Sequence, residues 1–276
     1  MKEIESILLS FGAGRQALAT GIACETVSGG AINRTIRVTS VGVDWAVRLA
    51  GPGDDALLVS RVGERDAQAA AAALGFAPAV VYADPVLGIL VSQWLPAANA
   101  SADLFDSEAG LSRLARRVRE LHDSPVPAGL RPIDADSVAR EYLSAAGAGS
   151  GPVSRRLLQD AVQRSESRRR TERPAFCHND LHALNVLDGE NLWFIDWEYA
   201  GCGDPLFELA GIIGYHNLSA RQSAALLASY GGVEVAEITA WLMLFDSVHA
   251  LWLDVANAWH TVPELRRAAL IQRLGA

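Results

Sequence analysis

Apolar and polar positions alternate over short stretches in the first hundred residues, which is the pattern of half-buried β-strands. Glycine-rich turns follow the first stretch, at 28–30, and the third, at 51–53. The alanine-rich segment 56–74 is typical of a helix, and Gly75 follows it as a stop signal. The pattern predicts three strands, one helix and two further strands, with the strands at 25–27, 33–39, 44–49, 79–82 and 88–93.

From about Asp103 onward the apolar positions follow the longer period of helices. Helices are predicted at 108–122, 135–146, 153–166, 205–215, 220–229 and 233–258. A β-rich half followed by an α-rich half predicts an α+β fold of two lobes with a cleft between them. We expect an N-terminal lobe, 1–95, that contains a β-sheet and one helix, and a larger, mostly helical C-terminal lobe, 96–276. The connection between them is expected near 94–98.

Charge and cysteine content narrow the classes of partner. The chain carries 24 Lys and Arg against 32 Asp and Glu, a formal net charge of -8, which argues against nucleic acid or an anionic membrane. Its three scattered cysteines form no CxxC pair, so a disulfide framework is not expected and a reducing cytosol is. No charged start with an apolar run appears, and the expectation is a cytoplasmic protein with no membrane partner. The sequence does not indicate an oligomeric state.

The single lysine of the chain, Lys2, excludes one class of nucleotide-binding site. A Walker-type phosphate loop requires GxxxxGK[ST], and no lysine is present at such a position. Nucleotide binding, if it occurs, has to use arginine and backbone groups.

The most informative stretch is FCHNDLHALNVL, at 176–187, which contains His178, Asp180 and Asn185 in the spacing H-x-D-x-x-x-x-N. Asp196 comes eleven residues after Asn185, at the end of a predicted strand. In kinases with this spacing an Asp accepts the proton of the substrate hydroxyl and an Asn helps to hold magnesium. An amide oxygen and a carboxylate are hard ligands that suit Mg²⁺ better than zinc.

Two segments, CHNDLHALNVL and LWFIDWEYAGCGDPLFELA, resemble the choline kinase, thiamine kinase and aminoglycoside phosphotransferase superfamily. The sequence IDWEYAG, at 195–201, is most similar to the choline and thiamine kinase branch. The resemblance implies a bilobal, protein-kinase-like fold whose N-terminal lobe is an antiparallel sheet. It also implies ATP and Mg²⁺ as cofactors, with Asp180 as the catalytic base, His178 as support of its loop, and Asn185 and Asp196 as metal ligands.

The N-terminal lobe is similar to the family at several positions. Gly29, Gly30 and Asn33 resemble a GG-x-x-N-R turn that covers the ATP phosphates. Arg48 stands where protein kinases have a strand lysine that reaches the α and β phosphates, and Glu64 matches the carboxylate that pairs with it. A guanidinium at this place delivers two directed donors to a phosphate.

The resemblance extends to the connection between the lobes. Gln93 and Trp94, at the end of the fifth predicted strand, are similar to the segment that contacts adenine through backbone groups. The sequence DWE at 196–198 replaces the DFG of protein kinases, so a small-molecule kinase is favoured over a protein kinase.

The acceptor pocket is expected to contain Glu198, Tyr199 and Trp252. The sequence HALW, at 249–252, resembles the H-x-x-W of choline kinases, whose aromatic rings help to enclose a quaternary ammonium. Val255 stands where those kinases have a second tryptophan. A stripe of buried core residues is the alternative interpretation of the aromatic positions 241, 245, 252 and 259.

The function expected is an ATP-dependent small-molecule kinase that phosphorylates the hydroxyl of a small cationic alcohol, as choline, ethanolamine or thiamine kinases do. An aminoglycoside or amino-sugar phosphotransferase is the alternative. A metal-dependent hydrolase built on His178, Asp180, His182 and Asp196 and an inactive nucleotide-binding scaffold are less favoured.

Two other features are expected to be structural. Asp204, directly before a proline, is predicted to be a helix N-cap. A cluster of arginines is predicted to be a solvated helix face or loop, rather than an anion site, at positions 164, 168, 169, 170 and 173.

Overall fold

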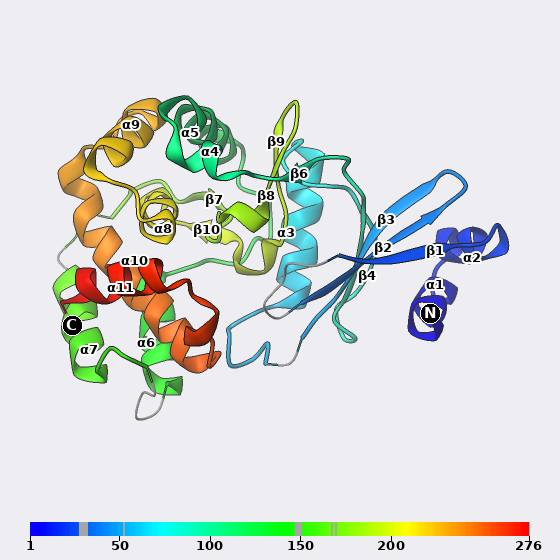
Figure 1. Ribbon diagram of the computed structural model, residues 1–276, viewed down its shortest axis with the longest axis horizontal. Coiled ribbons are helices and arrows are strands. Elements are labelled where there is room, and N and C mark those ends of the chain that lie inside the picture. Colours follow the sequence, from blue (N-terminus) through cyan, green and yellow to red (C-terminus); the bar gives the residue numbers. More distant parts are fainter. Residues whose placement is uncertain (28–32, 52, 147–150, 167, 169, 276) are drawn as a thin grey trace.

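Two lobes make up the computed structural model, which describes residues 1–276 except 28–32, 52, 147–150, 167, 169 and 276 (Figure 1). The N-terminal lobe is built on a five-stranded antiparallel sheet of order β1-β2-β3-β5-β4. Its strands are β1 (Ala23–Val27), β2 (Arg34–Ser40), β3 (Val43–Leu49), β4 (Val80–Asp84) and β5 (Ile89–Gln93). The predicted succession of three strands, a helix and two strands is confirmed.

The two faces of this sheet have different neighbours because successive side chains of a strand point to opposite sides. Trp45 and Val47 of β3 lie in an apolar cluster with residues of the two N-terminal helices. Arg48, one residue on, forms an ion pair with Glu64 of α3 (Arg61–Ala73) on the other face. α3 therefore lies between the sheet and the C-terminal lobe (Figure 1).

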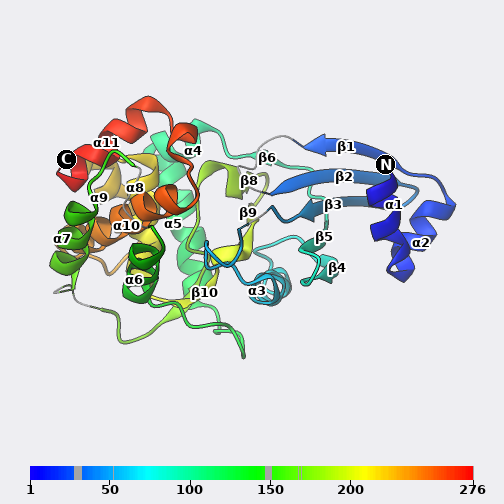
Figure 2. The same cartoon turned by 90° about the horizontal axis from the view of Figure 1, so that it is seen from below.

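The N-terminal lobe contains more than the single predicted helix. α1 (Lys2–Leu9) and α2 (Gly12–Ala19) precede the sheet, at its end farthest from the other lobe (Figure 1, Figure 2). Glycines reduce helix propensity, which hides α2 from sequence inspection. At Gly14 the glycine is required, because a Cβ there would lie 2.2 Å from the carbonyl oxygen of Leu8.

The prediction of a helix over 56–74 was too long at its start. Ser60 caps α3, its hydroxyl accepting a hydrogen bond from the N–H of Gly63 at 3.1 Å. Because a serine at this position satisfies the free N–H groups of the first turn, the helix begins at Arg61.

The C-terminal lobe is mostly helical, as expected. Two of its helices, α4 and α11, were not predicted. The N-cap prediction for Asp204 is confirmed, because its Oδ1 accepts from the N–H of Leu206 at 2.9 Å. The helices are α4 (Ala102–Asp106), α5 (Glu108–Asp123), α6 (Ala135–Ala145), α7 (Arg155–Ser165), α8 (Pro205–His216), α9 (Ala220–Tyr230), α10 (Val235–Val255) and α11 (Glu264–Leu274).

α10 is the central helix of this lobe and packs against α6, α7 and α8. Within the described part of the chain it alone has the length and apolar composition to cross a membrane, and half of its most apolar window is buried. Trp241 and Phe245 are buried in the core, whereas Trp252 is partly exposed. The aromatic stripe is thus divided between core packing and the cavity described below.

Short strands and 3₁₀ turns carry the motif residues in the part of the C-terminal lobe that faces the N-terminal lobe (Figure 2). β7 pairs with β10, and β8 lies between β6 and β9. These elements are β6 (Ala98–Asn99), β7 (Ala175–Cys177), η1 (Ala183–Asn185), β8 (Val186–Asp188), β9 (Leu192–Phe194), η2 (Trp197–Tyr199) and β10 (Gly201–Gly203), with η3 (Trp259–Thr261) following α10.

The arginine cluster differs from its prediction at Arg168. This side chain is buried, donates to Asp136 Oδ2 at 2.6 Å and lies with its guanidinium carbon 4.2 Å from the ring centroid of Trp241. A buried carboxylate requires a partner, and Asp136 is fully buried. Arg168 is therefore a core residue rather than part of a solvated face, while Arg169 lies outside the described residues.

Candidate functional site

A cavity of about 1380 Å³ lies between the lobes and brings most of the predicted site residues together. His178 lies behind its wall, fully buried. Gly29 and Gly30 lie outside the described residues. The predicted residues that line the cavity are Asn33, Arg48, Glu64, Gln93, Trp94, Asp180, Asn185, Asp196, Glu198, Tyr199 and Trp252.

His178 holds the loop in place through both ring nitrogens. Its Nε2 is 3.0 Å from the carbonyl oxygen of Ile195, and its Nδ1 accepts from the N–H of Asp180 at 3.3 Å. Burial lowers the pKa of His178, so the ring is neutral and carries its proton on Nε2. One imidazole thus ties the segment before Asp196 to the backbone of Asp180, which agrees with its predicted supporting role.

Asp180 faces the cavity with a carboxyl group that is only partly engaged. The side-chain amide of Asn185 donates to its Oδ2 at 2.9 Å, and His182 Nε2 lies 3.6 Å from the same oxygen. Burial raises the pKa of Asp180 well above its usual range, and the charges of Asp196 and Glu198 add to the effect. The carboxylate therefore binds a proton more tightly than an ordinary aspartate does.

Asp196 has a strained backbone and a buried, unpartnered oxygen. Its φ of 66° lies in the left-handed region, which costs a non-glycine residue free energy and is common at functional sites. Within the described part of the chain, its Oδ1 is buried without a hydrogen-bond partner, as is Oε1 of Glu64. Burial raises the pKa of Asp196 to about 7, with contributions from Glu198 and Glu64.

A divalent cation fits this place. Glu64, Asp196 and Glu198 offer carboxylate oxygens that lie within 4.8 Å of one another. Asn185 lines the same cavity, with its Nδ2 turned to Asp180. Oxygen donors of this kind are the ligands that Mg²⁺ prefers. The orphaned oxygen of Asp196 agrees with its predicted role as a metal ligand.

Arg48 forms the predicted pair with Glu64 and keeps donors free. Its Nη2 donates to Glu64 Oε2 at 2.5 Å, in a buried contact. Its Nε and Nη1 are buried, with no hydrogen-bond partner among the residues that the structure describes. Because a buried donor without a partner is costly, these two groups mark a place where an anionic ligand is expected.

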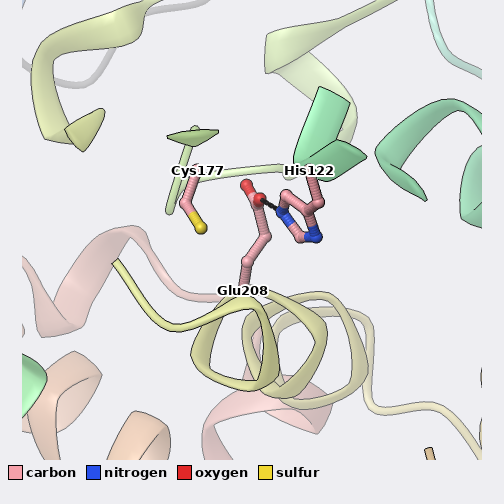
Figure 3. A group of neighbouring side chains, drawn as sticks. All are labelled: His122, Cys177 and Glu208. Atoms are coloured by element: carbon pink, nitrogen blue, oxygen red, sulfur yellow. Dashed lines mark hydrogen bonds and ion pairs between the residues drawn. The ribbon is translucent and has the colours of Figure 1, made fainter. Parts of the chain in front are cut away.

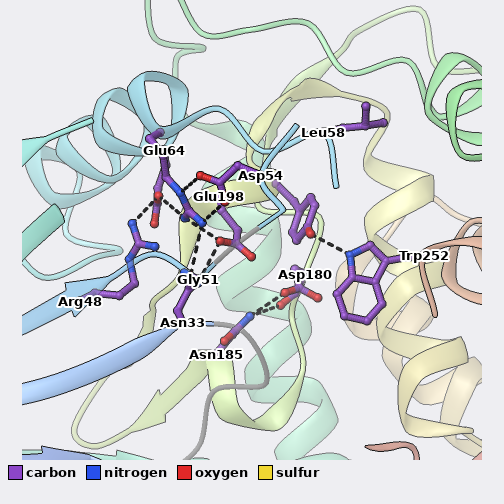
Figure 4. A network of polar contacts seen from close by, with 12 residues as sticks. Asn33, Arg48, Gly51, Asp54, Leu58, Glu64, Asp180, Asn185, Glu198 and Trp252 are labelled. Atoms are coloured by element: carbon purple, nitrogen blue, oxygen red, sulfur yellow. Dashed lines mark hydrogen bonds and ion pairs between the residues drawn. The ribbon is translucent and has the colours of Figure 1, made fainter. Parts of the chain in front are cut away.

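Arg61, the first residue of α3, was missed by sequence reasoning and joins the lobes. Its Nη1 donates to Glu64 Oε2 at 2.9 Å and to Glu198 Oε2 at 2.8 Å. Its Nη2 and Nε donate to the two carboxylate oxygens of Asp54, at 2.6 and 2.7 Å. The Asn33 amide also donates to Glu198, at 3.0 Å (Figure 4). Burial lowers the pKa of Arg61, but its hydrogen bonds and carboxylate neighbours outweigh burial and raise it overall.

The predicted adenine contact at Gln93 and Trp94 is constrained by bonds already made. The N–H of Gln93 donates to the carbonyl of Ala79 and the N–H of Trp94 to that of Asp44, both at 2.8 Å. The guanidinium of Arg37 lies 4.7 Å from the ring centroid of Trp94. These two N–H groups are therefore not available to a base, and the contact stays a prediction for the remaining polar groups of this segment.

The wall beyond Asp180 is aromatic. Trp252 Nε1 donates to the hydroxyl of Tyr199 at 2.8 Å, which fixes the two rings relative to each other (Figure 4). The ring of Tyr215 stacks between those of His182 and His249, at centroid distances of 4.9 and 5.5 Å. This wall also includes Arg266, whose guanidinium carbon is 5.2 Å from the ring of Tyr215.

Glu208 of α8 holds the start of the loop and was also missed. Its Oε1 accepts from the N–H groups of His178 and Asn179 at 2.9 and 2.8 Å. His122 Nε2 bonds its other oxygen at 2.5 Å (Figure 3). The Nδ1 of His122 lies 2.9 Å from the hydroxyl of Tyr230. Burial works to raise the pKa of Glu208, but the bond from His122 and the other donors hold it below its usual value.

The alternative of a zinc hydrolase finds no support in the ring nitrogens of His178, which are both bonded to backbone groups. Among the described residues, the groups of side chains close enough to share an ion are His122, Cys177 and Glu208, and Glu64, Asp196 and Glu198. Neither group contains His178 or His182.

Comparison with known proteins agrees with this geometry. Residues 23–243 match the sequence profile of the phosphotransferase enzyme family. The LicA protein of Haemophilus influenzae (strain Rd) is 49% identical over 55 residues, which are 20% of this chain and 21% of that protein. The chain therefore aligns with about a fifth of the length of this relative.

Similarity to solved structures extends over nearly the whole chain. A choline/ethanolamine kinase family protein from Mesorhizobium loti has a TM-score of 0.75 and 26% identity, with 99% of this chain and 92% of that chain covered. A structure of LicA in complex with AMP has a TM-score of 0.75 at 18% identity and covers 99% and 96% of the two chains. The predicted protein-kinase-like fold is confirmed.

Proposed function

This chain belongs to the phosphotransferase enzyme family and is a small-molecule phosphotransferase, and from that premise we propose that its acceptor is a small cationic alcohol of the choline and ethanolamine class. We further propose that the donor is ATP with Mg²⁺. One arrangement carries the proposal. Asp180 lies in the same cavity as the unpartnered donors of Arg48 and the bonded rings of Tyr199 and Trp252.

Phosphoryl transfer needs alignment and neutralisation of charge more than covalent chemistry. The Nε and Nη1 groups of Arg48 donate to phosphate oxygens, and Glu64 fixes the guanidinium through its third nitrogen. Asp180 orients the acceptor hydroxyl and takes its proton as the new bond to phosphorus forms. The raised pKa of Asp180 favours this proton transfer, because general bases work best near the operating pH.

Asp196 and Asn185 are the residues that would hold magnesium, which when bound neutralises charge on the β and γ phosphates. Asn185 also holds Asp180 through two hydrogen bonds, to its carboxylate and to its backbone carbonyl, both at 2.9 Å. Through Asn185, the base and the metal ligands keep a fixed spacing. His178 adds a second link between the two segments.

The aromatic wall supports a small cationic acceptor over an aminoglycoside. Faces of Trp and Tyr attract ammonium groups, and a substrate with one cation needs only one such place. An aminoglycoside carries several ammonium groups and needs several carboxylates. The wall beyond Asp180 includes Tyr215, the two stacked histidines and the positively charged Arg266. The carboxylates of Asp55, Asp134 and Glu141 line the cavity elsewhere, at α6, its N-cap and the loop before α3.

Glu198 was predicted to meet the cation of the acceptor. Its Oε2 accepts from Arg61 and Asn33, and the side chain lies with Glu64 and Asp196. In this arrangement Glu198 belongs to the nucleotide side of the cavity. Tyr199 and Trp252 remain as the proposed acceptor contacts.

The experiment is ADP release from Mg-ATP by the purified protein, with choline, ethanolamine, thiamine, glucosamine and two aminoglycosides as acceptors. We expect choline or ethanolamine to raise ADP formation well above background, and the Asp180→Asn variant to abolish the increase. A response to an aminoglycoside alone would assign the chain to the alternative substrate class. ATP binding without any acceptor-dependent ADP would contradict the proposal.

A further inference from the structure

Arg61 occupies an unusual position for a surface-helix arginine. It is buried at 9% exposure at the start of α3, and its three guanidinium nitrogens all donate to side chains. Its Nη1 lies between Glu64 Oε2 and Glu198 Oε2, at 2.9 and 2.8 Å. These two carboxylates, with Asp196, form the group whose oxygens lie within 4.8 Å of one another.

The oxygens of this group divide into two kinds. Those that face Arg61 are saturated, because Glu64 Oε2 accepts from Arg48 and Arg61, and Glu198 Oε2 accepts from Arg61 and Asn33. Glu64 Oε1 and Asp196 Oδ1 are buried and accept no hydrogen bond from any residue that the structure describes. The guanidinium of Arg61 thus occupies Glu64 Oε2 and Glu198 Oε2, which could otherwise bind a cation. Glu64 Oε1 and Asp196 Oδ1 remain open as ligands.

Charge balance leads to the same conclusion. Four carboxyl groups meet here, from Asp54, Glu64, Asp196 and Glu198. Among the described residues, Arg48 and Arg61 are the cations that form ion pairs with this group. Without Arg61, three carboxylates in close proximity would share a single guanidinium. Buried like charges at such distances repel strongly and attract a divalent cation.

We propose that Arg61 is the built-in counter-ion of the Glu64, Asp196 and Glu198 cluster, which keeps a divalent cation from settling there until the nucleotide brings its own oxygens. The inference rests on the proposed magnesium site and adds an order of binding to it. Arg61 acts as a positioning residue. It holds Glu198 of the C-terminal lobe against α3, and it leaves Asp196 Oδ1 as the open ligand for a nucleotide-bound metal.

The test is a titration of the full chain with Mn²⁺ in the absence of nucleotide. The concentration of free Mn²⁺ is measured by electron paramagnetic resonance, which gives the affinity of the protein for the ion. We expect Arg61→Gln to bind Mn²⁺ at least about tenfold more tightly than the wild type, because removal of one guanidinium exposes the carboxylates. A merely structural role of Arg61 predicts the opposite, since a disordered site binds metal more weakly. Arg65→Gln, on the same helix but 40% exposed in its side chain, is the matched control and should not change the affinity.

A double variant, Arg61→Gln with Glu198→Gln, locates the gain. It should return Mn²⁺ affinity toward the wild-type value if the new binding uses the carboxylate cluster. A folded Arg61→Gln protein whose affinity is equal to or weaker than that of the wild type would overturn the inference, and so would a gain that the double variant retains.

Arg61→Met is the second variant if Arg61→Gln does not fold. It keeps an unbranched side chain but removes the charge and the donors that Glu64 and Glu198 accept. We expect Mn²⁺ affinity to rise at least about tenfold, as in Arg61→Gln, and an unchanged affinity would overturn the inference. Failure of the wild type to bind Mn²⁺ together with an ATP analogue is a separate result, because it would contradict the proposed magnesium site itself.

Discussion

The proposed nucleotide side and the proposed acceptor side of the cavity are built in opposite ways. On the nucleotide side, charged residues of both lobes form a buried network around Glu64 and Glu198. On the acceptor side, the wall consists of stacked aromatic and imidazole rings around Tyr215. Asp180 lies between the two and is connected to both, through Asn185 and His182.

This difference indicates that one side of the cavity determines the reaction and the other side determines which acceptor is used. A charged network can hold phosphates and a metal whatever the acceptor is, so it sets the reaction. A wall of rings excludes water and distinguishes acceptors by shape and charge. Variants on each side should therefore affect different kinetic constants.

Asp180→Asn is expected to have the largest effect, because it removes the base that the two sides share. Turnover should fall by about 10²- to 10⁴-fold, the usual contribution of a positioned base, while nucleotide affinity changes little. Steady-state kinetics and nucleotide titration measure the two quantities. Asp188→Asn, at the end of β8 with a partly exposed ion pair to Arg113, is the control and should remain active. If turnover in Asp180→Asn were not reduced, Asp180 could not be the catalytic base.

Arg48→Ala should act on the nucleotide side alone. Loss of charge-assisted hydrogen bonds to phosphate is expected to raise the KM for ATP by about 10- to 100-fold, with little effect on the KM for the acceptor. Arg48→Lys should recover part of the loss, since it restores the charge without the directed pair of donors. An unchanged KM for ATP would mean that the unpartnered nitrogens of Arg48 do not meet the nucleotide.

Trp252→Leu should act on the acceptor side alone. A cation over a Trp ring is stabilised by about 1–2 kcal/mol, so the KM for the acceptor should rise by about 5- to 30-fold while the KM for ATP stays constant. Trp252→Phe keeps a ring but loses the bond to Tyr199 and should have an intermediate effect. Trp259→Phe, outside the cavity lining, is the control. Equal effects of Trp252→Leu and Trp259→Phe on the KM for the acceptor would argue against a specific acceptor contact at Trp252.

One titrating group on each side should also make the free energy of unfolding depend on pH, and the two contributions should have opposite sign. Burial lowers the pKa of His249 to about 4, so between 4 and 6.5 the unfolded chain binds more protons and stability falls as pH falls. Asp196, raised to about 7 by burial and Glu198, binds its proton in the folded state, and its contribution to stability falls as pH rises from about 4 to 7.

Urea unfolding between pH 5 and 6, without nucleotide, tests this contrast. His249→Phe should lower the slope of unfolding free energy against pH by up to about 1.4 kcal/mol per pH unit, and Asp196→Asn should raise it by a similar amount. Slopes that shift in the same direction in both variants would contradict the assignment of opposite titrations to the two sides.

The sequence predicted the nucleotide side better than the acceptor side. Asp180, Asn185 and Asp196 lie in two short segments with fixed spacing, so their proximity follows from local structure. Arg48 and Glu64 belong to a strand and a helix that follow directly along the chain. Tyr215, His249 and Arg266 come from three separate helices, and only the packing of α8, α10 and α11 brings them together.

Arg61 and Glu208 show why some site residues were missed. Each is an ordinary charged residue in the first turn of a helix, where exposure to solvent is the usual outcome. Arg61 becomes a site residue only because Glu198 approaches it from the other lobe, while Asp54 of the preceding loop holds its outer edge. Glu208 does so because the loop places two N–H groups at its carboxylate. In the fold, α1 and α2 were missed for a different reason, since each has only eight residues and α2 also contains two glycines, so that their local patterns are weak.

The most direct test of the account compares choline with 3,3-dimethylbutan-1-ol, a neutral alcohol of the same shape, in acceptor-dependent ADP formation. The account predicts that kcat/KM for choline exceeds that for the neutral alcohol by at least about tenfold, and that Trp252→Leu removes most of this difference. Equal values for the two alcohols, or no ADP formation with choline, would contradict the central claim that the aromatic side selects a cationic alcohol.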